Sequence, residues 1–272
     1  MKSHTITGGN GTKLHVAESG DPSGKPIVFI HGFSQCWLSW QRQMESELAD
    51  RFRLVAVDLR GHGRSEKPVE GYDDSGLWAD DINAVIEGLD LDHPVLSGWS
   101  YGPLVILDYL RRYGEDNVAG MNFVGGITKI GSDEAASVLT DDFISLIPGF
   151  FSDDASESSA ALGSLVDLCF TKDISEAERY MMLGLNANVP PHVRRGLFSR
   201  SLDNDDLLGG LSKPALVTQG TEDSVVKADV VEKQFSLIGN LRVEMIDDAG
   251  HACFWDNAQE YNRVLAEFTE AA

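Results

Sequence analysis

Two kinds of hydrophobic spacing alternate along the chain. Short apolar runs bounded by turn residues are followed by segments in which apolar side chains recur at a helical spacing. This alternation is typical of βαβ units around a mostly parallel sheet. Ahead of the first run, residues 5–18 predict an antiparallel hairpin with its turn at the Gly and Asn residues 8–11. The apolar runs lie at residues 25–30, 53–59, 93–99, 118–126, 213–220 and 241–250.

Helices that pack on this sheet are predicted from the stripes between and after the runs. One stripe lies at residues 78–89 and another at residues 261–268. Asn257, with Glu260 three residues later, predicts a capping box at the start of the last helix. The end of the chain is therefore expected to be docked on the core.

The alternation is interrupted once, between residues 126 and 211. No convincing strand pattern occurs there, but helix starts do, at Ser175 with Glu178 and at the pair Pro190 and Pro191. We therefore predict an α/β fold: a doubly wound, mostly parallel sheet formed by residues 1–126 and 210–272. Residues 127–209 are predicted to be a helical cap inserted over that sheet.

Composition narrows the class of protein. With 272 residues, 42% of them hydrophobic and 24% charged, the chain can bury the core of one domain with an insertion, which excludes disorder. A formal charge of −21 repels polyanions, so we expect no nucleic-acid partner. The first residues contain no long apolar stretch, so we expect no signal peptide and no membrane partner.

The cysteines indicate a reducing compartment. Cys36, Cys169 and Cys253 are odd in number and far apart, which suits neither a disulfide framework nor a structural zinc site. We expect three buried free thiols, a cytoplasmic protein and no structural metal.

The sequence Gly98-Trp99-Ser100-Tyr101-Gly102 matches the G-x-S-x-G motif of a strand-to-helix turn that exposes a serine hydroxyl. A predicted strand precedes it, and a helical segment with Pro103 in its first turn follows. Small residues are needed at 98 and 102 because the turn brings two backbones close together. Ser100 is therefore the candidate nucleophile.

A serine nucleophile needs a histidine base and a carboxylate that orients it. Only His192 and His251 follow the motif, and His251 is favoured because it follows the last predicted strand, whereas His192 lies in the predicted cap. In this fold the acid precedes the histidine in the chain.

Asp223 is the candidate acid because it lies on the loop that leaves the strand at 213–220, at the carboxyl edge of the sheet. Glu222 is its competitor, while Asp247 and Asp248 are interpreted as solvated charges. An acid after the strand at 118–126 is disfavoured, since no carboxylate occurs there before Asp133.

An oxyanion hole requires two backbone N–H groups directed at the developing charge. The sequence His31-Gly32-Phe33 directly follows the predicted strand at 25–30. We predict that the amides of Phe33 and Tyr101 form the hole, and that the imidazole of His31 has a structural role.

Five motifs together resemble the α/β-hydrolase superfamily: HGF at 31–33, DLRGHGRS at 58–65, GWSYG at 98–102, GTED at 220–223 and GH at 250–251. The resemblance is closest to its serine branch of small carboxylesterases and cofactor-free, haloperoxidase-like perhydrolases. It covers residues 1–126 and 210–272. Epoxide hydrolases and haloalkane dehalogenases of similar layout carry aspartate where this chain has Ser100, so those reactions are disfavoured.

The resemblance implies a serine hydrolase that cleaves a carboxylic ester or related acyl compound through an acyl-enzyme, with no cofactor and no metal. The alternatives are perhydrolysis, carbon–carbon bond hydrolysis or cofactor-free oxygenation by the same triad, and a non-catalytic ligand-binding receptor. The expected partner is a small apolar or aromatic acyl substrate. The apolar cluster in the predicted cap either packs the cap on the sheet or lines the substrate pocket, and its candidate binding residues are Phe143, Ile147, Phe150 and Phe151.

Overall fold

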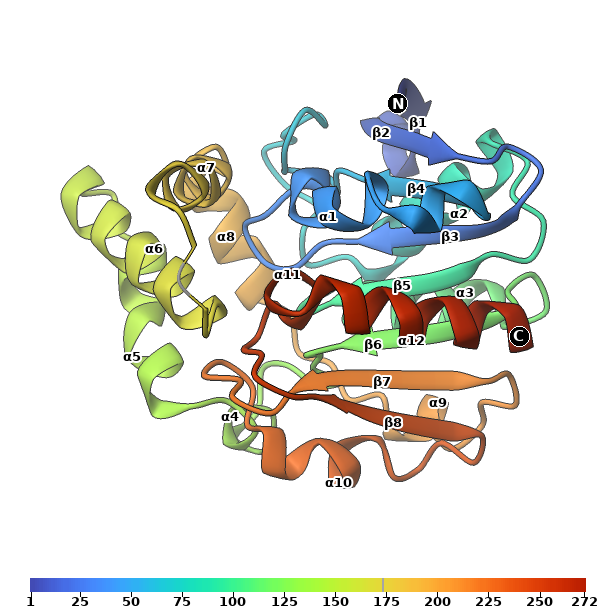
Figure 1. Ribbon diagram of the computed structural model, residues 1–272. Helices are drawn as coiled ribbons and strands as arrows, with labels where there is room; N and C mark the ends of the chain where they lie inside the picture. Colours follow the sequence, from blue (N-terminus) through green and yellow to red (C-terminus); the bar gives the residue numbers. More distant parts are fainter. Residues whose placement is uncertain (173) are drawn as a thin grey trace.

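The computed structural model describes residues 1–172 and 174–272 and contains one eight-stranded sheet with the order β1-β2-β4-β3-β5-β6-β7-β8 (Figure 1). Strand β2 is antiparallel to β1 and β4, and the other neighbouring strands are parallel. The strands are β1 (Lys2–Thr7), β2 (Lys13–Gly20), β3 (Lys25–Ile30), β4 (Phe52–Val57), β5 (Val95–Trp99), β6 (Gly120–Val124), β7 (Ala215–Gly220) and β8 (Leu241–Ile246).

Helices cover both faces of this sheet, with α1, α11 and α12 on one face and α2 and α3 on the other (Figure 1). The predicted α/β fold, doubly wound and mostly parallel, is confirmed. The helices of the core are α1 (Gln41–Met44), α2 (Ser75–Gly88), α3 (Gly102–Tyr113), α10 (Val231–Phe235), α11 (Cys253–Asp256) and α12 (Ala258–Ala271).

The segment between β6 and β7 is helical, and in the described residues its only β pairing is two isolated bridges, one of them to Val226. We call residues 127–209 the cap segment; its status as a separate unit stays a prediction. Figure 1 shows α5, α6, α7 and α8 grouped at the left, beyond one end of the strands of the sheet. The helices are α4 (Asp133–Ser137), α5 (Asp141–Phe150), α6 (Ala155–Cys169), α7 (Glu176–Ala187), α8 (Pro191–Phe198) and α9 (Asp205–Leu208).

Local signals placed the predicted starts of α7, α8 and α12 correctly. The Ser175 side chain accepts a hydrogen bond from the Glu178 N–H, and the Glu178 carboxylate reaches back, so this capping box is present. The capping box predicted at Asn257 is wrong: its side chain makes no cap bond and instead donates to the Asp247 carbonyl at 3.4 Å. Glu260 cannot complete the box because its carboxylate pairs with Arg263.

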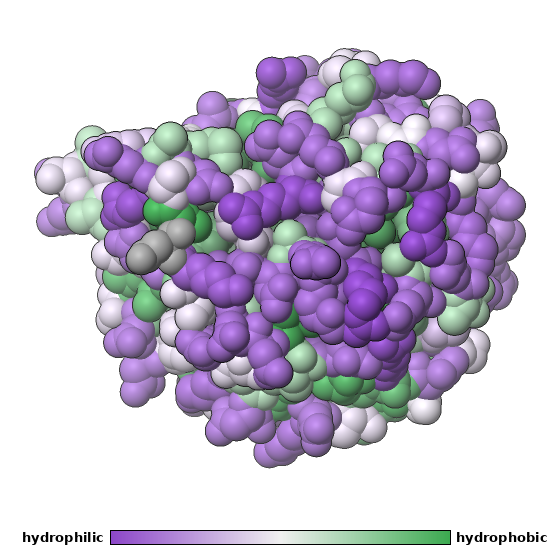
Figure 2. Space-filling view, in the orientation of Figure 1, coloured by the Kyte–Doolittle hydropathy of each residue, from purple (hydrophilic) through white to green (hydrophobic). Residues whose placement is uncertain are grey.

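The interior is apolar and the surface is polar. Strands β3, β5, β6 and β7 are buried along almost their whole length, as expected for central parallel strands covered on both faces. Figure 2 shows one mostly hydrophilic face, with hydrophobic atoms exposed only in small groups.

All three cysteines are buried and free, as predicted. No helix among the described residues combines the length and apolarity that a membrane span requires.

Candidate active site

Ser100 lies where β5 turns sharply into α3. Its φ is +60°, a left-handed conformation that costs energy for any residue with a side chain. Two backbone hydrogen bonds hold the turn: the Ser100 N–H donates to the Val124 carbonyl at 2.8 Å, and the Ile127 N–H donates to the Ser100 carbonyl at 3.2 Å. The strained residue is therefore fixed by the neighbouring strand β6.

Three glycines let other backbone segments approach this turn. A Cβ at Gly98 would lie 2.7 Å from the carbonyl carbon of Gly102, and a Cβ at Gly102 would lie 2.6 Å from the Ile30 oxygen. A Cβ at Gly32 would lie 2.9 Å from the Cβ of Ser100. These separations are shorter than real Cβ contacts, so larger residues would force the strand, the helix and the loop after β3 apart.

Asp223 and His251 follow β7 and β8 and form a buried pair. The Nδ1 of His251 lies 2.9 Å from Oδ2 of Asp223. The other carboxylate oxygen accepts hydrogen bonds from the N–H groups of Val225 at 2.7 Å and Val226 at 2.9 Å. Because these donors fix the carboxylate, Oδ2 faces the imidazole and leaves Nε2 as the ring nitrogen available to another partner.

The loop that carries His251 is anchored on two sides. The Trp99 side chain, from the residue before Ser100, donates from Nε1 to the His251 carbonyl at 2.9 Å. The Asp256 carboxylate accepts from the N–H of Gly250 at 2.8 Å and from the N–H of Thr171, in the cap segment, at 3.0 Å. The imidazole is thus held relative to both the serine turn and the cap segment.

The alternative residues lie elsewhere or are exposed. His192 is exposed, and its Nε2 lies 3.2 Å from the Pro68 carbonyl. Glu222, Asp247 and Asp248 are also exposed. After β6, Gly125 lies so close to the His–Asp pair that a Cβ there would be 3.1 Å from the His251 Nδ1.

The backbone N–H groups of Phe33 and Tyr101 donate no hydrogen bond to any other part of the chain that the structure describes. Both residues line the same cavity as Ser100, so their amides are available near the serine. The His31 ring is engaged on both sides, with Nε2 accepting from the Leu59 N–H at 3.0 Å and Nδ1 bonded to the Gly32 carbonyl. This is consistent with a structural role for His31.

A cavity of about 330 Å³ opens at Ser100. Phe143 and Ile147, two of the four residues predicted to bind the substrate, line it. The other two predicted residues do not line it. Phe150 is fully buried, with its ring 5.3 Å from that of Phe33, and the Phe151 ring packs edge-on against Phe198.

Several cavity residues were missed from the sequence. They come from the segment after β6, the residues that follow α4 and the loop after β7. No local pattern distinguishes them from ordinary core residues: Ile127, Ile130, Leu139, Val225 and Val226. Gln219 was missed as well; its Nε2 donates to Oδ2 of Asp223 at 2.6 Å. Its place on β7, four residues before the acid, was the only available signal.

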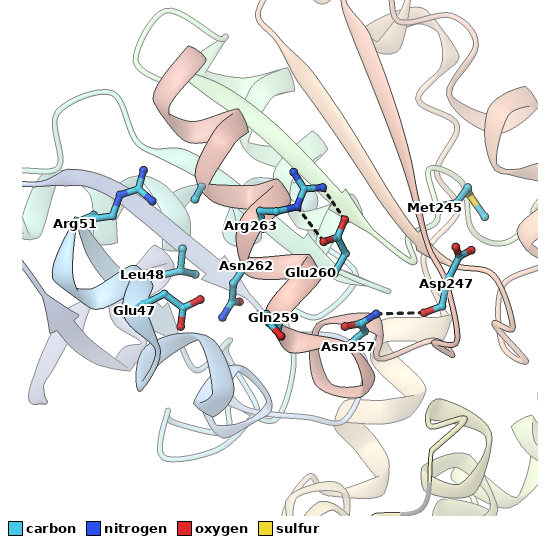
Figure 3. Close-up of a pocket in the computed structure, with 11 residues that line it drawn as sticks. Glu47, Leu48, Arg51, Met245, Asp247, Asn257, Gln259, Glu260, Asn262 and Arg263 are labelled. Carbon is cyan, nitrogen blue, oxygen red and sulfur yellow. Dashed lines mark hydrogen bonds and ion pairs between the residues drawn. The ribbon is translucent and has the colours of Figure 1, made fainter.

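A larger hollow of about 660 Å³ lies elsewhere, between residues 47–51, the end of β8 and α12 (Figure 3). Its labelled side chains are mostly polar, and Arg263 is paired with Glu260 on the same helix, α12. It is lined by none of Ser100, Asp223 and His251. Chemistry rather than volume therefore identifies the smaller cavity as the candidate active site.

Comparison with known proteins identifies the family and similar folds. A model of the Alpha/beta hydrolase family matches residues 27–264. The structure is similar to an esterase from Rhodococcus sp. ECU1013, with 35% identity, 99% of each chain covered and a TM-score of 0.93. It is also similar to a putative aryl esterase from Burkholderia cenocepacia, with 31% identity, 99% of this chain and 98% of that chain covered, and a TM-score of 0.89. A non-heme chloroperoxidase from Streptomyces lividans is 26% identical over 98% of this chain and 99% of its own length.

Proposed function

The chain belongs to the alpha/beta hydrolase family, and we propose that it is a serine hydrolase that cleaves carboxylic esters through an acyl-enzyme. It is an enzyme of the carboxylic ester hydrolase type. The proposal of a serine mechanism rests above all on one observation. Ser100 has a φ of +60° at the end of β5 and lines an apolar cavity, at the same sheet edge as the Asp223–His251 pair.

In the proposed reaction the Ser100 Oγ attacks the ester carbonyl while Nε2 of His251 takes the hydroxyl proton. The resulting imidazolium is stabilised by Asp223 and gives the proton to the departing alcohol, which leaves an acyl-serine. The N–H groups of Phe33 and Tyr101 donate to the oxyanion of the tetrahedral intermediate. Water, deprotonated by His251, then attacks the acyl-serine, and the carboxylic acid and the free serine are formed.

Perhydrolysis is the second candidate, favoured by the similarity to a non-heme chloroperoxidase. Hydrogen peroxide would replace water in the second step and attack the same acyl-serine, so that the product would be a peracid. Both reactions use the same residues and differ only in the second nucleophile. Every step is carried by side chains and amides of this chain.

The cavity supports a small apolar or aromatic acyl group. Phe143, Ile147 and Phe198 contribute aromatic and aliphatic walls, and the accessible volume is about 330 Å³. An apolar pocket with a few polar groups at one end is typical of sites that bind small ligands.

The test is a Ser100→Ala variant. We expect it to fold normally, to lose turnover by several orders of magnitude and to lose labelling by a fluorophosphonate, because triad members act as a unit. Ser145→Ala, at an exposed position on α5, is the matched control and should keep both properties. The substrates are p-nitrophenyl esters of graded acyl length, with peracid formation scored in the presence of hydrogen peroxide.

More than about a tenth of wild-type turnover in Ser100→Ala would contradict the nucleophile assignment. A wild-type protein that is labelled by the fluorophosphonate but turns over no ester would instead favour the receptor interpretation.

A further inference from the structure

One stretch of the cap segment, residues 197–200, contacts both residues proposed to form the oxyanion hole. The Phe198 ring packs edge-on against the Phe33 ring, with 5.1 Å between their centres. The Tyr101 hydroxyl donates to the Leu197 carbonyl at 3.2 Å. Nη1 of Arg200 donates to the same hydroxyl at 3.1 Å. The end of α8 therefore meets the site from the side of the amides.

Arg200 is fixed in place by the core of the protein. It is only 2% exposed, and its Nη2 lies 2.7 and 2.6 Å from the two carboxylate oxygens of Asp108 on α3. Nη2 also donates to the Ser75 hydroxyl on α2 at 2.8 Å. The guanidinium carbon lies 5.8 Å from the centre of the Trp78 ring. A guanidinium held by a carboxylate, a hydroxyl and a ring has little freedom to move.

The Tyr101 side chain is a rigid link between this arginine and the active site. The residue is 3% exposed, and burial raises the pKa of its hydroxyl to about 12, so the hydroxyl keeps its proton and can donate to Leu197 while it accepts from Arg200. At the other end of the residue, the backbone N–H of Tyr101 belongs to the peptide bond that joins it to Ser100. The tyrosine side chain has two torsions, and hydrogen bonds at its hydroxyl fix the direction of the ring axis and so restrict the first of them, χ1.

We propose that Arg200 is a positioning residue for the reaction: by holding the Tyr101 hydroxyl, it fixes the orientation of the Tyr101 N–H that donates to the oxyanion. The cap segment would then contribute to the rate of the chemical step as well as to the choice of acyl group. Oxyanion donors act only when they are held close to their productive geometry, so a distant anchor can change the rate without touching the substrate. This inference rests on the proposed serine hydrolase function.

The first test is Tyr101→Phe, which removes the hydroxyl and leaves the backbone amide in place. Tyr109→Phe is the matched control, because Tyr109 lies on α3, the helix that begins directly after Tyr101, and its hydroxyl is buried and has no partner among the described residues. We expect kcat to fall about tenfold in Tyr101→Phe, a fraction of the 10²–10³-fold loss that follows complete removal of one oxyanion donor. KM should stay within about twofold, and Tyr109→Phe should behave like the wild type.

A transition-state analogue separates positioning from a purely structural role. A trifluoromethyl ketone forms an oxyanion on the serine, so its affinity should weaken by the same factor as kcat/KM in Tyr101→Phe. Esters of all acyl lengths should lose the same factor, since the amide acts on the carbonyl and not on the acyl chain. A structural role would lower the melting temperature and leave these two quantities unchanged.

Arg200 itself is tested together with its partner. Arg200→Gln alone would leave the Asp108 carboxylate buried without a counter-ion, so the variant to make is Arg200→Gln with Asp108→Asn. The kcat of this double variant should fall by about the same factor as that of Tyr101→Phe. The combination of all three substitutions should lower kcat no further, since each set breaks the same contact between Arg200 and the Tyr101 hydroxyl.

The proposal is overturned if kcat/KM and the analogue affinity of Tyr101→Phe both stay within twofold of the wild type. It is also overturned if the fall in kcat of the triple variant equals the product of the falls in Tyr101→Phe and in Arg200→Gln with Asp108→Asn. Failure of the proposed function itself looks different, because Ser100→Ala would then keep its turnover, or the wild-type protein would turn over no ester.

Discussion

Replacing Asp223 by Asn is expected to leave the fold intact and to reduce kcat/KM by about 10³–10⁴-fold. In the native protein the side chain accepts four hydrogen bonds, two at each oxygen. The N–H groups of Val225 and Val226 donate to Oδ1, while Gln219 and His251 lie at 2.6 and 2.9 Å from Oδ2. The substitution turns one of these oxygens into an NH₂ group, and the neighbours decide which one.

An NH₂ group in place of Oδ1 would face the two backbone N–H groups and leave both without an acceptor. Each buried, unsatisfied donor costs about 1–3 kcal/mol, so this orientation is disfavoured by several kcal/mol. An NH₂ group in place of Oδ2 faces Gln219, whose Oε1 has no partner among the described residues, so a flip of that amide can supply an acceptor. The flip costs the 3.2 Å hydrogen bond from Gln219 Nε2 to the Val226 carbonyl, which is one bond against the two lost in the first orientation. The second orientation is therefore favoured, and it also faces His251.

An NH₂ group that donates to Nδ1 of His251 forces the imidazole proton onto Nε2. That nitrogen can then no longer accept the proton of Ser100, and a 10³–10⁴-fold loss corresponds to about 4–5.5 kcal/mol of transition-state stabilisation. The assay is kcat/KM with a p-nitrophenyl ester, accompanied by thermal unfolding. Glu222→Gln is the control, because this exposed neighbour should lose little. More than a tenth of wild-type kcat/KM in Asp223→Asn, or an equal loss in Glu222→Gln, would refute the assignment.

Three further predictions follow from burial and packing. Phe143→Ala should move the preferred substrate toward longer acyl chains, which is measured as kcat/KM across acetyl to octanoyl esters. The discrimination between esters should change by about 1–3 kcal/mol. A fall of kcat/KM by one common factor for all esters would mean that Phe143 only packs the cap segment. Burial holds the pKa of His62 well below its usual value. Only the unfolded chain then takes up this proton, so the free energy of unfolding in urea should decrease as pH falls through about 6.5, the ordinary pKa of histidine. His62→Gln should remove that part of the slope. Burial raises the pKa of Cys36 to about 12 and also raises the pKa values of Cys169 and Cys253. Iodoacetamide at pH 8 should therefore modify none of the three thiols in the folded protein and all three after unfolding. Rapid modification of the native protein would contradict the burial of these thiols.

Local sequence determined most of the elements and the turn that carries the candidate nucleophile. Apolar runs and helical stripes reproduced the strands and the helices α2 and α12, because their spacing depends only on which face of one element is buried. The short helices α1, α10 and α11 were not predicted. The serine turn could also be predicted, since Gly98, Ser100 and Gly102 lie within five residues. The two glycines are needed there because backbone segments approach each other closely at the turn. Asp223 was placed by its position after a buried strand, although only the structure shows its bond to His251.

Only the tertiary structure decided contacts between distant residues. Phe150 and Phe151 carry the same apolar signal as Phe143, but the packing of α5 turns Phe143 toward the cavity and buries Phe150 against Phe33. In the same way, the anchoring of Asn257 on the Asp247 carbonyl removes a cap that the local pattern predicts.

Arg200 is the clearest case of such a contact. It lies 92 residues from Asp108 and 99 from Tyr101 along the chain, and no local periodicity links the three. Hydrophobic patterning reports which residues are buried, whereas partners across the fold depend on how the elements are arranged in three dimensions. The sequence therefore determined the fold and the candidate nucleophile, and the tertiary structure decided what holds the site in place.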